Sequence, residues 1–183
     1  MTTNKNRRNS WIAIGIIALP FVWTIPTFYY LHQQTQSRNT QCESQLKKLG
    51  ISILSEYAAN HDGVLPDAKN WLNKIKDFKI NDLRCPNDPD KSRKVSYAMN
   101  ANLSGKKLSE IKNPSQVILL YETNSKESTP FGVGKDMADI GKPKNGQGRH
   151  NLVGYRFNFF LMADGTVRQA GTPDEKKSLR WTP

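Results

Sequence analysis

The side chains with the most distinctive chemistry in this chain are its two cysteines, Cys42 and Cys85. Outside a reducing cytoplasm, an even number of cysteines predicts a disulfide. Such a bond would close a long loop and contribute about 3–4 kcal/mol to stability by chain entropy. Two unpaired thiols are the alternative, because spacing alone does not show whether the two Cβ atoms meet. Two cysteines without a matched pair of histidines do not make the usual zinc pattern.

A group of oxygen-bearing side chains follows the second cysteine: Asn87, Asp88 and Asp90. Carboxylate and amide oxygens are the ligands that Ca²⁺ prefers, so these three residues could supply a calcium site. The stretch lacks the spacing and the closing Glu of a dedicated calcium loop. A turn without metal is the alternative, because Asn and Asp beside proline are typical turn formers. Calcium is the one cofactor that the sequence suggests.

His150 is the remaining candidate for chemistry. It could orient the carboxylate of Glu122 or of Asp164, and a purely structural histidine is the alternative. We interpret Asp164 and Gly165 as the turn of a hairpin, because Asp-Gly is a strong hairpin signal. The chain contains no Gly-x-Ser-x-Gly, no complete phosphate loop and no His-Glu-x-x-His. The sequence therefore predicts no catalytic residues and a protein that is not an enzyme.

The elements that position these residues begin with an apolar run over residues 11–31, which follows a basic head at residues 1–10. The run has no charged residue and, at about 1.5 Å of rise per residue, reaches across a hydrocarbon core of roughly 30 Å. It predicts a single-pass helix in membrane lipid of the bacterial inner membrane, with a cytoplasmic head and an extracytoplasmic domain. A cleaved signal peptide and a buried core helix are the alternatives. Bulky residues at the end of the run and the lack of a polar face argue against them.

The net charge of the chain indicates which kind of partner it could bind. A net charge of +11 and a pI of about 9.7 favour an anionic partner. The basic residues are scattered and not interleaved with aromatic residues, which argues against nucleic acid. Residues 126–148 are rich in Gly and Lys and lack periodicity, so they predict a long surface loop that could bind a polyanion. A solvated basic surface without a specific ligand is the alternative.

Residues 42–60 carry apolar side chains at helical spacing. Leu46, Leu49 and Ile53 recur at intervals of three and four residues, which predicts one face of an amphipathic helix. A juxtamembrane segment at residues 32–41 precedes it, either as a linker or as a continuous exposed helix.

The rest of the chain predicts a small antiparallel sheet, because its short apolar runs are bounded by turn formers. The predicted elements are a helix end near Gly63, a second helix capped by Asp67, strands over 95–99 and 116–122, a hairpin over 155–170 and a frayed polar tail over 172–183. Residues 42–171 are thus expected to form one α+β domain.

The order of these landmarks resembles that of the type IV pilin-like and type II secretion pseudopilin-like proteins of bacteria, in the subgroup with a His followed by an Asp-Gly hairpin. The matching stretches are CESQLKKLG at 42–50, YAANHDG at 57–63, LRCPND at 83–88, SYAMN at 96–100, NPSQVILLYE at 113–122, RHN at 149–151 and ADGTV at 163–167. The resemblance implies a pilin-like α+β fold. In it, a long N-terminal helix, transmembrane and then amphipathic, packs on a small antiparallel β-sheet.

The resemblance also implies a function. The protein would be a membrane-anchored structural or interaction protein of the bacterial cell envelope, linked to a secretion or pilus-type assembly. Its partners would be other envelope proteins or further copies of itself. An envelope-anchored module that binds a polyanionic surface ligand is the alternative.

Overall fold

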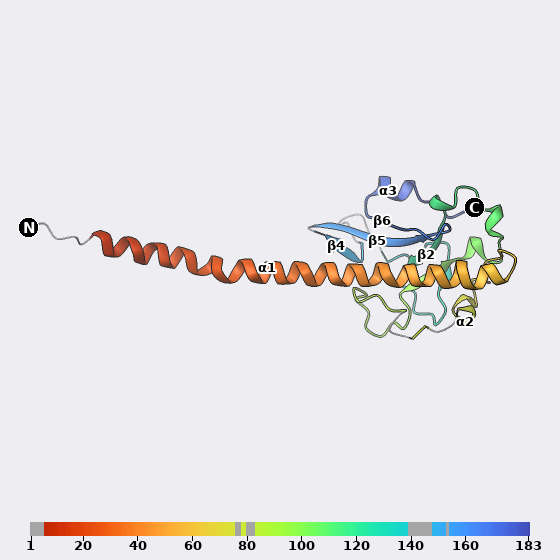
Figure 1. The fold of residues 1–183 in the computed structure, drawn as a ribbon, viewed down its shortest axis with the longest axis horizontal. Coiled ribbons are helices and arrows are strands. Elements are labelled where there is room, and N and C mark those ends of the chain that lie inside the picture. The colour runs from red at the N-terminus through yellow and green to blue at the C-terminus, as the bar shows by residue number, and fades with distance from the viewer. Residues whose placement is uncertain (1–5, 76–77, 80–82, 139–147, 153) are drawn as a thin grey trace, which may run out of the picture. The chain divides into compact units, whose positions relative to one another are not determined.

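The computed structural model describes the backbone of residues 6–75, 78–79, 83–138, 148–152 and 154–183, and the side chains of these residues from Pro26 onward. The chain divides into two compact units, residues 1–37 and 38–183. The order of elements is a long helix, α1 (Asn6–Ile51), followed by short helices and a six-stranded sheet (Figure 1).

The first unit contains the N-terminal part of α1, and its described side chains are largely exposed. Two glutamine–tyrosine pairs link successive turns of this helix. Gln33 Nε2 donates to Tyr29 OH and Gln34 Nε2 donates to Tyr30 OH, both at 2.6 Å. Contacts between residues four apart stabilise a helix locally by about 0.2–0.5 kcal/mol each.

The structure contradicts the predicted transmembrane helix. Within the part of the chain that the structure describes, no helix combines the length and the apolar character needed to cross a bilayer. The helix does not end at residue 31, because α1 continues through a polar stretch to Ile51. The transmembrane span over residues 11–31 is therefore wrong, and so are the single-pass inner-membrane location and the fold class that included such a helix. The side chains of residues 1–25 lie outside the described residues.

The second unit is built on the sheet. Its strands are β1 (Tyr97–Asn100), β2 (Ile118–Glu122), β3 (Phe131–Gly132), β4 (His150–Leu152), β5 (Tyr155–Met162) and β6 (Val167–Ala170). They are ordered β3-β1-β2-β5-β4, and β6 also pairs with β5. The predicted antiparallel sheet is corrected to a mixed one, because β1 and β3 run parallel, with Met99 opposite Phe131. After β2 the chain runs to the far edge of β1, where β3 pairs with it in the same direction.

Short helical segments connect the larger elements. They are η1 (Ser52–Tyr57, a π-helix), η2 (Ala58–Asn60), α2 (Trp71–Lys74), η4 (Ala101–Leu103), η5 (Leu108–Glu110), η6 (Pro114–Gln116) and α3 (Pro173–Lys177). The predicted helix end at Gly63 is confirmed by its φ of +76° and by its N–H, which donates to Ala58 O at 2.9 Å. The second predicted helix is only one turn long. Asp67 does not cap it, because its Oδ1 accepts from Lys69 N–H at 3.2 Å within a local turn.

The core lies on both faces of the sheet. On one face, Leu46 and Leu49 of α1 share a buried cluster with Leu161 of β5. On the other face, Phe160 and Met162 of the same strand belong to a second cluster. Successive residues of β5 therefore point to opposite faces, as its sequence spacing predicts. The predicted apolar face of the amphipathic helix is confirmed as well.

The closing hairpin is confirmed at the predicted position. Gly165 has φ +87°, a conformation that glycine adopts at little cost. Asp164 Oδ1 accepts from Thr166 N–H at 2.9 Å, which makes Asp164 a turn former and not a partner of His150.

The tail differs from the frayed segment that its polarity predicts. It contains α3, which begins with a capping box between Thr172 and Glu175. In this motif the two residues satisfy each other's backbone N–H groups, which stabilises even a short helix.

Candidate functional site around the Cys42–Cys85 disulfide

The structure joins Cys42 of α1 to Cys85, in the loop before β1, through a disulfide with the Cα atoms 5.0 Å apart. The predicted disulfide is confirmed. Both side chains are completely buried, so the bond belongs to the core of the second unit. It fastens the helix to the loop that carries the predicted calcium ligands.

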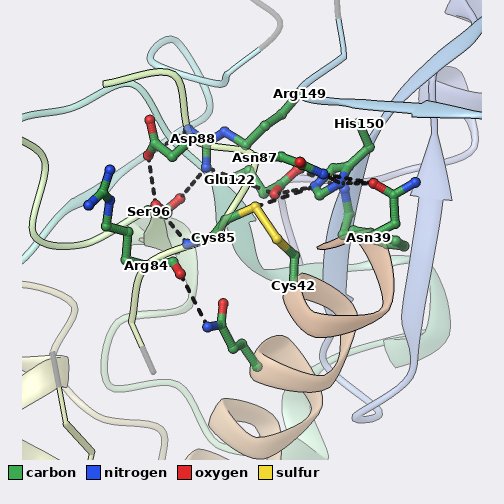
Figure 2. The surroundings of a disulfide bond; sticks show 12 residues. Asn39, Cys42, Arg84, Cys85, Asn87, Asp88, Ser96, Glu122, Arg149 and His150 are labelled. Atoms are coloured by element: carbon green, nitrogen blue, oxygen red, sulfur yellow. Dashed lines mark hydrogen bonds and ion pairs between the residues drawn. A yellow bond between two sulfur atoms is a disulfide. The ribbon is translucent and has the colours of Figure 1, made fainter. Parts of the chain in front are cut away.

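His150, the first residue of β4, lies against this disulfide (Figure 2). Its Nε2 is 3.8 Å from Cys85 Sγ and 2.7 Å from Glu122 Oε1. Glu122 ends β2, and both β2 and β4 pair with β5, which brings the two residues together. Of the two carboxylates that His150 was expected to orient, the structure places Glu122 beside it.

Two asparagines hold the opposite side of the imidazole ring. His150 Nδ1 lies 2.9 Å from Asn39 Oδ1 and 3.0 Å from Asn87 Nδ2, and Asn87 Nδ2 donates to Asn39 Oδ1 at 2.8 Å. Nδ1 donates to Asn39 in one tautomer of the ring and accepts from Asn87 in the other. The ring is therefore oriented with Nε2 toward Glu122 and the disulfide.

A second buried ionic cluster lies beside Glu122 and centres on Asp88. Asp88 accepts a hydrogen bond from Arg93 and another from Ser96 Oγ at 2.7 Å, and it forms an ion pair with Arg149 Nη2 at 3.3 Å. Arg149 Nη1 lies 3.9 Å from Glu122 Oε1. Each of these buried carboxylates thus has a cation beside it, which offsets part of the cost of removing it from water.

The three predicted calcium ligands bind different partners in the structure. Asp88 is held by the arginines, and Asn87 directs its amide nitrogen to Asn39. Asp90 accepts from the side chain and the backbone of Ser92, and these hydrogen bonds lower the pKa of Asp90. The turn alternative describes this stretch, and calcium binding stays an untested prediction.

Tyr97 borders the disulfide on the side of α1. Its OH donates to Gln45 Oε1 at 2.7 Å and lies 3.3 Å from Cys42 O. Complete burial raises the pKa of Tyr97 well above its ordinary value, and the Glu122 carboxylate adds to this effect. The phenol therefore stays protonated and acts as a donor to the helix.

Four side chains of metal-ligand type meet at this point, from α1, the loop before β1, β2 and β4. The ligand atoms of Cys42, Cys85, Glu122 and His150 all lie within 4.8 Å of one another. Sequence reasoning treated the cysteines and the histidine separately, because they are far apart along the chain. Asn39, three residues before Cys42 and so on the same side of the helix, is the residue of α1 that contacts His150.

The basic loop at residues 126–148 is described only in part, since residues 139–147 lie outside the described residues. Lys126 is exposed and approaches Asp90 Oδ2 at 3.9 Å. A polyanionic partner therefore stays a prediction.

Comparisons of the chain with protein-family models, with curated proteins and with solved structures found no match. The fold and the site define an α+β protein with a long helix, a mixed sheet and a disulfide that lies beside buried ionic side chains. The pseudopilin-like resemblance depends on the sequence motifs.

Proposed function

We propose that the protein is a non-catalytic structural subunit of the pseudopilin-like kind that associates with further copies through the N-terminal part of α1. The observation that carries the proposal is a run of exposed apolar residues in the first unit. Phe28 and Leu31 are 71% and 56% exposed, and Tyr29 and Tyr30 between them are exposed as well. Single exposed apolar residues are common, whereas apolar residues exposed on every side of one helical turn favour an interaction site.

A second copy of the chain is the partner that the patch favours. Phe28 and Leu31 are three residues apart, so they share one face of the helix, the arrangement through which two helices pack. Residues 9–37 contain no Asp, Glu, Lys or Arg. Two copies can therefore bring these segments together without repulsion between like charges, and the segment has no charge with which to select a charged partner.

The second unit is consistent with a scaffold. Its buried charged groups Asp88, Arg149 and Glu122 are bound to one another rather than directed to solvent. Residues 38–51 of α1 contribute to the same core as the sheet. This helix-on-sheet packing is what the resemblance implies for a subunit whose helix serves in assembly.

The test is the oligomeric state of the full chain, measured by light scattering after size exclusion and by sedimentation over a wide concentration range. We expect assembly that increases with concentration. The double variant Phe28→Ser/Leu31→Ser should shift the equilibrium to the monomer, because it removes apolar area at the contact. Ile51→Ser is the matched control, since Ile51 is 57% exposed on the same helix but lies in the second unit.

A chain that stays monomeric at every concentration would contradict the proposal. The same holds for assembly that the double variant leaves unchanged, or that Ile51→Ser weakens equally. Far-UV circular dichroism of each variant shows whether the helix is retained, so loss of assembly is not confused with loss of structure.

A further inference from the structure

The side chains around the disulfide that could bind a metal support a second inference, which does not depend on the association of α1. We propose that reduction of the Cys42–Cys85 disulfide creates a zinc site formed by Cys42, Cys85, His150 and Glu122. In the oxidised chain the sulfurs are bonded to each other. In the reduced chain they become thiolate ligands beside an imidazole nitrogen and a carboxylate oxygen.

The distances between the ligand atoms fit a four-coordinate site. Zn–S bonds of about 2.3 Å and Zn–N or Zn–O bonds of about 2.0 Å place tetrahedral ligand atoms roughly 3.3–3.8 Å apart. Cys85 Sγ already lies 3.8 Å from His150 Nε2, and all four ligand atoms lie within 4.8 Å of one another. His150 Nε2 and Glu122 Oε1 are 2.7 Å apart and would have to separate by about 0.6 Å. Breaking the S–S bond frees the sulfurs to move apart.

The donor set selects the metal. Two thiolates and an imidazole are soft to borderline ligands, which favour Zn²⁺ over Ca²⁺ or Mg²⁺. All four residues are buried, so the four protein ligands can complete the coordination sphere without an open position. A closed site of this kind is structural and stabilises the fold that surrounds it.

The surroundings orient and neutralise such a site. When Nε2 binds the metal, Nδ1 carries the ring proton and can donate it to Asn39 Oδ1, 2.9 Å away, the usual outer-shell role of a carbonyl oxygen. Zn²⁺ with two thiolates, one carboxylate and a neutral imidazole carries one negative charge. Arg149 Nη1 lies 3.9 Å from Glu122 Oε1 and can balance that charge.

Reduction of the disulfide balances in atoms and electrons when a thiol is the reductant. Two thiol molecules supply two electrons and two protons, form their own disulfide, and leave Cys42 and Cys85 as thiols. Binding of Zn²⁺ then releases both thiol protons, together with any proton on His150 Nε2. Oxidation by a disulfide reverses the exchange and expels the metal. Zinc affinity should therefore fall as the pH is lowered.

The first experiment uses the full chain without substitutions. The protein is reduced with a phosphine, desalted under argon and titrated with Co²⁺ and then Zn²⁺ beside the oxidised protein. We expect the reduced protein alone to bind one Co²⁺ with the intense visible bands of a tetrahedral thiolate site, which Zn²⁺ then bleaches. X-ray absorption at the zinc edge should show two sulfur and two nitrogen or oxygen neighbours. Zn²⁺ should also raise the Tm of the reduced chain.

Variants then assign the ligands. His150→Ala and Glu122→Gln should each weaken Zn²⁺ binding by at least ~10-fold, since loss of even an outer-shell partner has an effect of that size. Glu43→Gln is the matched control. Glu43 is an acidic residue next to Cys42 on α1, and it pairs with Lys47 at the surface. Its replacement should leave zinc affinity unchanged.

Three results would overturn the inference. One is equal Zn²⁺ affinity of the oxidised and reduced chains. The second is a Co²⁺ spectrum with the weak bands of an octahedral complex. The third is a zinc-edge spectrum without the mixed sulfur and nitrogen or oxygen shell. All three are measured on the unsubstituted protein, so they decide the question even where a variant fails to fold.

Discussion

At the scale of single residues, Glu122 connects the two buried ionic clusters. Its Oε1 faces His150, and its Oε2 accepts from Phe159 N–H at 3.0 Å. Arg149 lies next to the same carboxylate. Loss of one partner of a buried ion pair costs more than the pair contributes, because the remaining charge stays buried without a counter-charge.

We therefore expect Glu122→Gln to lower the free energy of unfolding by about 3 kcal/mol. Urea unfolding at neutral pH, with chelator present, measures the change. Glu110→Gln serves as control, because Glu110 is exposed and its replacement should change stability by less than about 0.5 kcal/mol. Equal stability of the two variants would show that the carboxylate is not needed for the core.

Gly171 lies so close to a neighbouring strand that no room is left for a side chain. A Cβ at this position would lie 2.0 Å from Arg156 O, a backbone atom of β5 that cannot rotate away. We expect Gly171→Ala to cost about 3 kcal/mol, the upper end of the range for overpacking. At Gly154 a Cβ meets no atom within 4 Å and only the positive φ of 85° opposes alanine, so Gly154→Ala should cost about 1 kcal/mol. Thermal melts of both variants test whether G171A is the more damaging change.

At the scale of elements, α3 depends on the ionisation of one side chain. Hydrogen bonds from Tyr155 OH and from the backbone N–H groups of Gly171 and Thr172 lower the pKa of Glu175 to about 2. Desolvation and the Glu175 hydrogen bond raise the pKa of Tyr155 to about 12. Glu175 therefore contributes stability above its unfolded pKa, near 4.5, and this is lost as the pH falls toward 2. Tyr155 contributes below pH 10, and this is lost as the pH rises toward 12.

Hydrogen exchange of the amides in α3 provides the measurement. Protection relative to the sheet should decrease between about pH 4 and pH 2, and Glu175→Gln should remove this pH dependence. Asp174→Asn is the control, because Asp174 pairs only with the exposed Lys177 at 2.9 Å among the described contacts. A loss of protection that persists in E175Q would assign the effect to another group.

The elements also show which features of the fold the sequence patterns can predict. The spacing of Leu46, Leu49 and Ile53 predicted the buried side of the helix, because periodicity is a local property. The Asp-Gly turn predicted the closing hairpin for the same reason. β3 was not predicted, because two residues are too few to show the alternation typical of a strand. Its parallel pairing with β1 depends on where the chain returns to the sheet. The apolar run at 11–31 predicted a membrane span from composition and length, which the structure contradicts.

The site could be predicted only in pieces. The Cys42–Cys85 pair followed from an even cysteine count, and Glu122 was one of two carboxylates expected near His150. The meeting of all four residues depends on β5, which pairs with both β2 and β4 and thereby places His150 beside Glu122. β4 and β5 are neighbours in sequence, but β2 and β5 are far apart, and their pairing is not encoded in any short motif. This is why a chain with a poor zinc pattern can still assemble a zinc-type donor set.

At the scale of the whole molecule, the disulfide is the main covalent constraint on the second unit. It links residues 43 positions apart, so chain entropy assigns it about 4 kcal/mol. Domains of this size have a total stability of only about 5–15 kcal/mol. Loss of the bond should therefore remove a large fraction of the stability without any change in the sheet or in the helix contacts.

The double variant Cys42→Ala/Cys85→Ala tests this expectation. Urea unfolding with chelator present should give a free energy of unfolding about 4 kcal/mol below that of the oxidised protein. Cys42→Ala alone should lose about the same amount, because one cysteine cannot form the bond. Reduced wild type without metal should resemble the double variant, and added Zn²⁺ should restore stability to the reduced wild type only. If the double variant is as stable as the oxidised protein, the bond does not constrain the unfolded chain, and the stability of the second unit comes from its buried core alone.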